Sequence, residues 1–94
     1  METAEFKQHL RSEGFIECGV KALEPGMIMA EHEHPFDVCG LVLDGEFALT
    51  VAGSETCYRA GEVFRMPADC PHSERTGTAG ARYLVGRRLL GGET

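Results

Sequence analysis

The chain has 94 residues, of which 43% are hydrophobic and 26% charged, and its formal net charge is −6. This length supports one small hydrophobic core, and this composition is typical of a globular domain rather than of a disordered segment. The nine basic residues are scattered, with only Arg87 and Arg88 adjacent, so no nucleic-acid partner is expected. No apolar run approaches the roughly 20 residues of a membrane helix and no signal peptide is recognisable, so we expect a cytoplasmic protein without a membrane partner.

The first predicted element is a short helix over residues 3–13. Phe6 and Leu10 lie four residues apart among polar residues, which predicts a helix with one apolar face. Thr3 is a suitable N-terminal cap, and Gly14 is a natural end because glycine readily adopts the left-handed conformation that terminates helices. We expect this helix to pack on the outside of the following domain or to reach over to a partner subunit.

From residue 15 onward, the chain consists of short apolar runs separated by glycines, a pattern typical of β-strands joined by tight turns. The pair Asp44-Gly45 between two apolar runs predicts a β-hairpin, since Asp-Gly suits the two-residue turns that reverse a chain. Further turns are expected at residues 53–54 and 60–62. These features predict an all-β domain, either an antiparallel barrel or a sandwich, preceded by one helix. The expected strands include residues 41–43, 47–51, 55–59, 63–66 and 83–85.

The four cysteines indicate neither a disulfide framework nor a zinc knuckle. They form no C-x-x-C pair, and the spacings between them are long. In a cytoplasmic chain we expect them to be reduced thiols that are mostly buried. These cysteines are Cys18, Cys39, Cys57 and Cys70.

Three of the four histidines favour a metal site. His32 and His34 lie two residues apart in a predicted extended segment, so their side chains should project from the same face. His72 lies about forty residues later and would complete a set of three nitrogen ligands if the two segments face each other. Such a set leaves coordination positions open for substrate or dioxygen. A pair of histidines on a strand can equally be solvated surface, and His9, in the helix, is expected to be solvated.

These histidines fall within two motifs that resemble those of the cupins. Gly26-x5-His32-x-His34 with a later Gly45 is similar to the first cupin motif, and Gly61-x5-Pro67-x-Asp69-x2-His72 is similar to the second. The resemblance is to small single-domain cupins of the cupin-2 type and covers about two thirds of the chain. It implies a small antiparallel β-barrel of the jelly-roll type, with a divalent metal held inside it by three histidines. The ligands that the resemblance implies are His32, His34 and His72.

One departure from the family concerns metal binding. In most metal-binding cupins a glutamate lies seven residues before the motif glycine, and this chain has Val38 there. The simplest expectation is a carboxylate-free three-histidine site, whose uncompensated positive charge favours anionic bidentate substrates. Glu74 could replace the missing ligand because it shares a strand face with His72. Asp37 and Cys39 would have to be turned inward by a bulge to do so.

The resemblance to three-histidine cupins, such as the thiol and diketone dioxygenases, implies a metal-dependent, dioxygenase-like enzyme. Its substrate would be a small organic acid or carbonyl compound, and oxidative cleavage is the leading reaction. Fe²⁺ is the favoured metal, with Zn²⁺, Ni²⁺ and Mn²⁺ as alternatives, because imidazole ligands suit them all. Glu74 or a bound hydroxide would serve as base. The residues expected to shape the pocket are Phe36, Val38, Phe47, Phe64 and Met66.

Two other functions stay open at this point. A non-catalytic small-molecule-binding or sensory module is one, by resemblance to the sensing halves of bacterial transcription regulators, although this chain has no helix-turn-helix. A metal-assisted isomerase or decarboxylase is the other, since it would use the same ligands.

The expected domain plan is a single unit, with a helix over residues 1–14, the barrel over 15–88 and a tail over 89–94. A homodimer is the expected assembly, because a barrel this small must protect its strand edges. The basic residues near the end of the chain should be mainly solvated, with one of them available to an anionic substrate. These residues are Arg82, Arg87 and Arg88.

Overall fold

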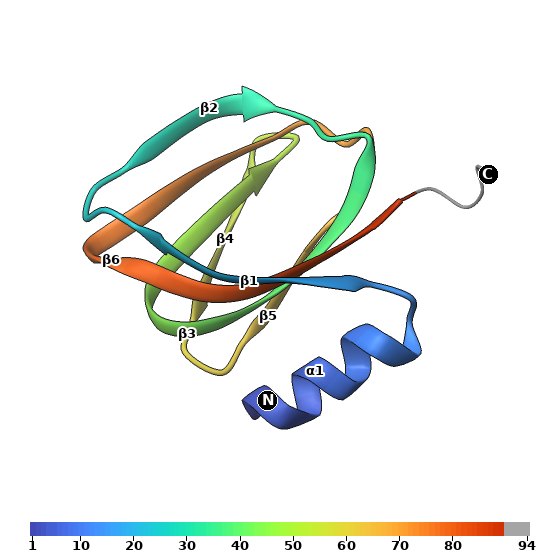
Figure 1. The fold of residues 1–94 in the computed structure, drawn as a ribbon. Helices are drawn as coiled ribbons and strands as arrows, with labels where there is room; N and C mark the ends of the chain where they lie inside the picture. The colour runs from blue at the N-terminus through green and yellow to red at the C-terminus, as the bar shows by residue number, and fades with distance from the viewer. Residues whose placement is uncertain (90–94) are drawn as a thin grey trace.

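In the computed structural model, which describes residues 1–89, one helix precedes six β-strands that roll into a barrel (Figure 1). Every strand pairing is antiparallel, so the predicted all-β barrel with an N-terminal helix is confirmed. The last strand extends one residue into the predicted tail, and the rest of that tail lies outside the described residues. The elements are α1 (Thr3–Ser12), β1 (Ile16–Leu23), β2 (Ile28–His32), β3 (Phe36–Val51), β4 (Ser54–Arg59), β5 (Val63–Met66) and β6 (His72–Leu89).

The two longest strands, β3 and β6, organise the barrel. They pair with each other along most of their length. On its other side, β6 pairs with β1 through its second half and with β2 through its first half. β3 pairs in turn with β4 and β5. The first half of β6 therefore lies between β2 and β3, and this arrangement positions the candidate site.

The predicted hairpin at Asp44-Gly45 is wrong, because β3 continues through these residues. Its register with β6 shifts on both sides of the pair, so the strand bends instead of reversing. Gly45 has a φ of +81°, and a Cβ atom at this position would overlap the carbonyl oxygen of Gly80 on the facing strand. The glycine that suggests a turn thus allows two bent strands to stay in contact.

The other strand predictions agree with the structure. The segments 55–59 and 63–66 correspond to β4 and β5, and residues 83–85 lie within β6. The turn between β3 and β4 has positive φ angles at both Ala52 (51°) and Gly53 (79°), as a two-residue reversal of antiparallel strands requires.

Helix α1 begins at Thr3 and ends at Ser12, one residue before the end of the predicted range, but its N-terminal cap differs from the prediction. Glu2 occupies the capping position without a side-chain hydrogen bond, and Thr3 is already helical, so the predicted threonine cap is wrong. At the other end Gly14 has a φ of +80°, and the Phe15 amide donates to the Leu10 carbonyl over 2.8 Å. No helix among residues 1–89 is long and apolar enough to cross a membrane.

Two clusters of buried side chains lie on opposite faces of the β3–β6 layer. One cluster joins α1 to the outer face, as expected for a helix that packs against its own barrel. Its members are Phe6, Leu10, Phe15, Cys39, Leu41 and Leu84. The other cluster fills the barrel and consists of Val38, Val42, Phe47, Leu49, Phe64, Met66, Ala81, Tyr83 and Val85.

The expectation of mostly buried cysteines is wrong, although all four thiols are free. Only Cys39 is buried, whereas Cys18 and Cys57 are exposed and Cys70 is partly exposed. Cys18 lies where the register of β1 shifts, Cys57 lies on β4 at the end of the sheet order, and neither belongs to a cluster of buried side chains.

Candidate metal centre

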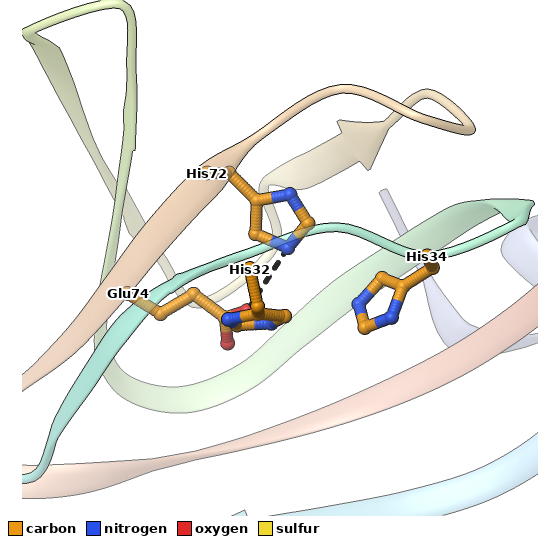
Figure 2. A group of neighbouring side chains, drawn as sticks. All are labelled: His32, His34, His72 and Glu74. Atoms are coloured by element: carbon orange, nitrogen blue, oxygen red, sulfur yellow. Dashed lines mark ion pairs between the residues drawn. The ribbon is translucent and has the colours of Figure 1, made fainter.

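Three of the four histidines lie together at the junction of β2, β3 and β6 (Figure 2). His32 ends β2, His72 begins β6, and the two residues face each other across this antiparallel pair. His34 lies in the link between β2 and β3, so it does not share a strand with His32 as expected. The ring centroids are 4.5 Å apart for His32 and His72, and His34 lies 5.0 and 5.1 Å from these two. The structure thus brings together the three imidazoles that the motifs single out.

Glu74 completes this group as a fourth donor. Its side chain is buried, and its Oε2 atom lies 3.1 Å from Nε2 of His32 and 3.3 Å from Nε2 of His72. One donor atom from each of the four residues lies within 4.8 Å of the others. The expectation of a carboxylate-free cluster is therefore wrong, because strand alternation directs Glu74 to the same face as His72. The four residues are referred to below as the His/Glu cluster.

The other two candidates for a fourth ligand are not part of this cluster. Asp37 accepts hydrogen bonds from the Ala68 amide and from Arg88, and these contacts lower the pKa of its carboxyl. Cys39 is buried beneath α1, and burial raises the pKa of its thiol. The bulge needed to turn either residue inward is not formed at this point of β3, whose register with β6 is regular from Phe36 to Val42.

Backbone carbonyls orient two of the imidazoles. Nδ1 of His72 lies 2.9 Å from the Cys70 carbonyl, and Nδ1 of His32 lies 2.7 Å from the Ala30 carbonyl. Because a carbonyl only accepts, each Nδ1 carries the hydrogen, and in the neutral imidazole each Nε2 presents a lone pair to the cluster.

His72 supplies the sharpest sign that the cluster fits a cation. Its Nε2 is buried without a hydrogen-bond donor or acceptor partner in the described residues, and the nearby Glu74 oxygen is itself an acceptor. A buried acceptor left without a donor costs on the order of 1–3 kcal/mol. A cation among the lone pairs removes this penalty, and imidazole and carboxylate are ordinary ligands of divalent transition metals. The residues present therefore fit a divalent metal ion.

The environment of His34 favours the neutral form of its imidazole. Burial, followed by the neighbouring His72 and His32, lowers the pKa of His34. Its ring also stacks on Phe36, with 5.1 Å between centroids and 9° between planes. A neutral, sterically fixed imidazole is the form that binds metals.

A cavity of about 460 Å³ adjoins the cluster. Phe36, Val38 and Met66 line it, in agreement with the predicted pocket. Phe47 and Phe64 do not line it; both are fully buried, and their rings pack together with centroids 4.6 Å apart. Arg87, one of the three arginines of which one was expected to be available to an anionic substrate, also lines the cavity. The lining residues that the sequence did not single out include Lys21, Leu23, Met29, Tyr83 and Val85.

Tyr83 brings a phenol to the cavity wall. Burial, followed by the negative charge of Glu74, raises the pKa of Tyr83 to about 12. The phenol therefore stays protonated at neutral pH and can donate a hydrogen bond into the cavity.

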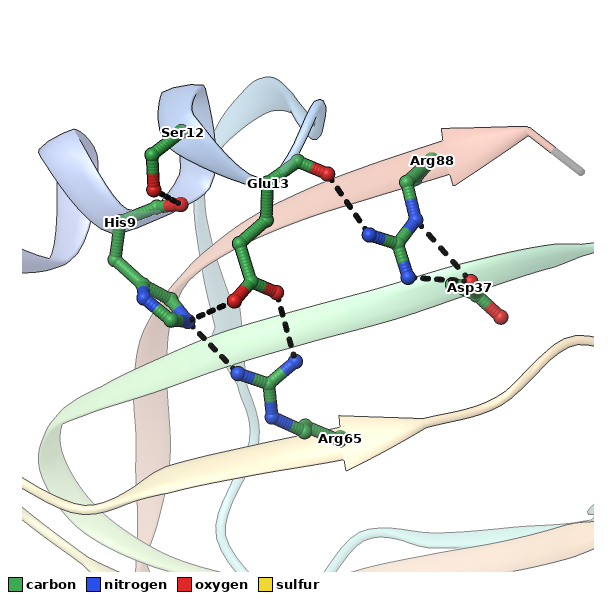
Figure 3. Close-up of polar contacts among 6 residues, drawn as sticks. All are labelled: His9, Ser12, Glu13, Asp37, Arg65 and Arg88. Atoms are coloured by element: carbon green, nitrogen blue, oxygen red, sulfur yellow. Dashed lines mark hydrogen bonds and ion pairs between the residues drawn. The ribbon is translucent and has the colours of Figure 1, made fainter. Parts of the chain in front are cut away.

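The loop between β5 and β6 is tied to the barrel beside the cluster. The Asp69 amide donates to the His34 carbonyl over 2.7 Å, and the Ala68 amide donates to Oδ1 of Asp37 over 2.8 Å. Arg88 donates to Oδ2 of Asp37 over 2.9 Å and to the Glu13 carbonyl over 2.8 Å (Figure 3). The end of α1, the barrel and the loop before His72 thus form one hydrogen-bonded chain.

His9, which was expected to be solvated, belongs to the same polar surface. Its Nε2 lies 2.7 Å from one terminal guanidinium nitrogen of Arg65, whose other terminal nitrogen lies 3.7 Å from Oε1 of Glu13 (Figure 3). His9 is only partly exposed, because α1 packs beside β5 at this point.

The structure resembles several solved proteins. It is similar to a protein of unknown function from Rhizobium leguminosarum bv. viciae 3841, with 20% identity, a TM-score of 0.72 and 96% of each chain covered. It is also similar to the DMSP lyase DddQ from Ruegeria pomeroyi DSS-3, with 26% identity and a TM-score of 0.68 over 80% of this chain and 38% of the lyase. A conserved protein from Streptococcus pyogenes gives 25% identity and a TM-score of 0.65 over 76% of this chain and 62% of its own.

The chain therefore spans less than two thirds of the length of the streptococcal protein and of the lyase. None of the curated protein sequences matches it. The family model described as "Cupin domain" matches residues 19–85, which include the whole His/Glu cluster and most of the barrel. By this match, and by the fold that supports it, the chain belongs to the cupin family.

Proposed function

We propose that this chain is a metal-dependent enzyme that acts on a small organic acid or carbonyl compound. The observation that carries the proposal is the buried Nε2 of His72, which has no hydrogen-bond partner among residues 1–89. It lies opposite the Glu74 carboxylate, beside a cavity large enough for a small substrate. A divalent metal bound there would act as a Lewis acid on a substrate oxygen. The mixed imidazole and carboxylate donors favour Fe²⁺, with Zn²⁺, Ni²⁺ and Mn²⁺ as alternatives.

The chain's own residues have separate tasks in this proposal. The three histidines and Glu74 hold the ion, and the apolar side chains of the cavity exclude water from the substrate. Glu74 is also the buried carboxylate nearest to the histidine nitrogens, so it is the candidate to accept a proton from the substrate. Tyr83, which stays protonated, donates a hydrogen bond to a substrate oxygen.

Proton-transfer chemistry, such as elimination, isomerisation or decarboxylation, is the reaction class that we favour. Glu74 supplies the carboxylate that a three-histidine dioxygenase site lacks. The similarity to a DMSP lyase, at 26% identity, supports the same class, since a lyase breaks a bond without consuming an oxidant.

Oxidative cleavage is the second candidate. Three of the four donors are imidazoles, which is the feature that this chain shares with the three-histidine dioxygenases. Oxygen consumption separates the two candidates. Iron-loaded protein should consume a substrate from a panel of small oxo and hydroxy acids without oxygen uptake in the first case, and with stoichiometric uptake in the second.

Metal content is the test of the proposal as a whole. Elemental analysis of the purified chain should find stoichiometric metal in the native protein and in a His9→Gln control, which alters the one histidine outside the cluster. His72→Ala should lose the metal. If the native protein stays metal-free after incubation with each of the four ions, the enzyme proposal fails. Binding of a small molecule by such metal-free protein would then favour the sensory module.

The partners that we propose are a small-molecule ligand and a second copy of this chain, with neither nucleic acid nor membrane. The homodimer is supported by exposed apolar side chains on β1 and β2, where Ile16 and Ile28 are 63% and 81% exposed.

A further inference from the structure

We propose that Arg87 and Lys21 form an anion-binding subsite in the cavity, and that the substrate is an organic acid held there by its carboxylate. A second oxygen-bearing group of the same molecule reaches the His/Glu cluster. The subsite stands on its own contacts. The role of the second group rests on the proposed function.

The distribution of ion pairs distinguishes these two cations. Six of the nine basic side chains lie within 4.0 Å of a carboxylate, and all nine belong to the described residues. Among residues 1–89, only Arg11, Lys21 and Arg87 have no such partner, and two of these three line the cavity. The chain has 15 acidic residues for nine basic ones, so a shortage of carboxylates does not explain why these cations lack a partner. The paired side chains are Lys7, Arg59, Arg65, Arg75, Arg82 and Arg88.

Strand register explains why both cations face the cavity. Tyr83, Val85 and Arg87 alternate along β6 and so share one face of the strand. Lys21 on β1 lies directly opposite Tyr83, and residues opposite each other in antiparallel strands point to the same side. Val38 lies opposite Arg87 on β3. The two cations therefore approach the cavity from neighbouring strands.

Aromatic contacts place Arg87 near the cluster. The guanidinium carbon lies 5.1 Å from the centroid of the Phe36 ring, which in turn stacks on His34 with 5.1 Å between centroids. The guanidinium is thus no farther from the His34 ring than these two contacts together. A small acid can span this distance. Stacking on an aromatic ring also restricts the guanidinium while leaving its N–H groups available.

The chemistry of the lining selects a carboxylate. A guanidinium binds a carboxylate through two parallel hydrogen bonds. Lys21 lies opposite Tyr83, four residues from Arg87 along β6, and adds attraction at longer range. The Glu74 carboxylate lies in the buried cluster, whereas Lys21 and Arg87 are exposed, so the field in the cavity directs an anion toward the outer end. The rest of the wall includes apolar side chains and suits a short hydrocarbon segment. Its side chains here include Val38, Met66 and Val85.

A comparison of acids with their esters tests the subsite. The probes are 2-oxopropanoate, 4-oxopentanoate and 5-oxohexanoate, each beside its uncharged methyl ester, titrated into the Zn²⁺-treated full chain and followed by ¹H–¹⁵N NMR. We expect at least one acid to bind about tenfold more tightly than its ester, as a charge-assisted contact at a partly exposed site provides. The preference should weaken as the salt concentration rises.

Arg87→Gln should reduce this preference several-fold, and a double variant with Lys21→Gln should abolish it. Arg82→Gln is the matched control, because Arg82 is on the same strand but is exposed on the other face and paired with Asp44. The proposal is overturned if none of the acids binds, if acid and ester bind equally, or if the preference survives in the double variant.

Metal content measured on the same samples separates this proposal from the proposed function. An acid preference in protein that retains none of Fe²⁺, Zn²⁺, Ni²⁺ and Mn²⁺ after incubation with each sustains the subsite and removes the enzyme proposal. Stoichiometric metal without an acid preference has the opposite meaning, since the metal centre then stands and the subsite fails.

Discussion

Two backbone carbonyls decide which nitrogen of His32 and His72 is available to a ligand. Each carbonyl, from Ala30 or Cys70, lies two residues before the histidine that it orients, so the same local device acts on two separate strands. Both Nε2 atoms then present lone pairs to the Glu74 carboxylate. A cation satisfies these three acceptors at once, which is why the residues at this site indicate metal more strongly than histidine spacing alone.

At the residue scale, Glu74→Gln should weaken metal binding by at least about tenfold, since it removes one donor and the only negative charge of the cluster. The variant should still fold, because the amide can donate a hydrogen bond to a histidine Nε2. Competition with a chromophoric chelator measures the affinity. Glu55→Gln, which alters an exposed carboxylate paired with Arg75, is the control. Equal affinities for the two variants would remove Glu74 from the ligand set.

Much of the site could be predicted at this scale. Motif spacing selects the three histidines, and alternation along one strand places Glu74 beside His72. The sequence named Arg87 only as one of three arginines, and it gave no sign of Lys21 as a second cavity cation. Lys21 and Arg87 share a face only through the pairing of β1 with β6, and that register includes a shift between Glu17 and Gly19 that no local pattern marks.

At the scale of elements, β3 and β6 are held together through a shared bend. Gly45 and Gly80 both have positive φ angles, and the backbone of one strand lies against the other where they face each other. The Asp-Gly signal for a hairpin fails here because the two bulged strands continue to pair beyond the bend. The Asp-Gly pattern correctly indicates a positive φ angle at Gly45. It does not reveal that pairing with β6 keeps β3 extended through this point.

Gly45→Ala tests this bend. The substitution adds a Cβ atom that overlaps the Gly80 carbonyl oxygen and also forces a side chain into a left-handed backbone conformation. We expect a loss of about 3 kcal/mol or more in the free energy of unfolding, measured by chemical denaturation. Gly53→Ala is the matched control, because its φ is similar at +79° but no atom lies within 4 Å of the added Cβ. It should cost only about 1 kcal/mol. Equal losses would show that the contact with Gly80 is unimportant.

Asp37 is the second feature at this scale, since it joins β3, β6 and the loop before His72. The hydrogen bond from the Ala68 amide, and then the one from Arg88, lower the pKa of Asp37. Asp37 therefore ionises more readily in the folded state than in the unfolded state, and its ionised form stabilises the fold. Its contribution to stability is complete above the ordinary aspartate pKa and is lost as the pH falls through the lowered pKa.

Asp37→Asn should therefore reduce the free energy of unfolding by about 1 kcal/mol at pH 7, with a smaller difference in acid. Thermal melts from pH 7 down to the acid limit of stability measure this. Asp44→Asn, at an exposed carboxylate paired with Arg82, should change the profile little. A deficit for Asp37→Asn that stays constant with pH would contradict the assignment.

At the scale of the whole molecule, one barrel carries the site on its inner face and the helix on its outer face. The helix is fixed by the apolar cluster around Phe6 and Leu10 and by the Arg88 contact to the Glu13 carbonyl. The amphipathic spacing of the helix and the β-rich pattern could be read directly from the sequence. The polar contacts between helix and barrel could not, since they join residues up to 75 positions apart.

Metal binding should stabilise this whole unit. An ion that binds only the folded chain raises the free energy of unfolding by about 2.7 kcal/mol at a free concentration of about 100 times its dissociation constant. Denaturation with and without Fe²⁺ or Zn²⁺ should show the rise in the native chain and in His9→Gln. His72→Ala should show none. A rise of the same size in His72→Ala would place the bound ion elsewhere.

The proposed homodimer is also a prediction about the whole molecule. Multi-angle light scattering on the purified chain should give twice the monomer mass of 10.2 kDa. An Ile28→Lys variant should shift the distribution toward monomer if the exposed face of β2 takes part. A monomer at all concentrations of the native chain would contradict the dimer.

The short β2 strand has one more consequence. It supplies His32, yet it spans only five residues, pairs with β6 through an irregular register and has no other strand partner among residues 1–89. Such a segment can open by itself while the rest of the sheet stays intact. An ion in the cluster would then leave at the rate at which this strand peels away, without global unfolding. Exchange of a bound metal and hydrogen exchange of the β2 amides should therefore share one opening step.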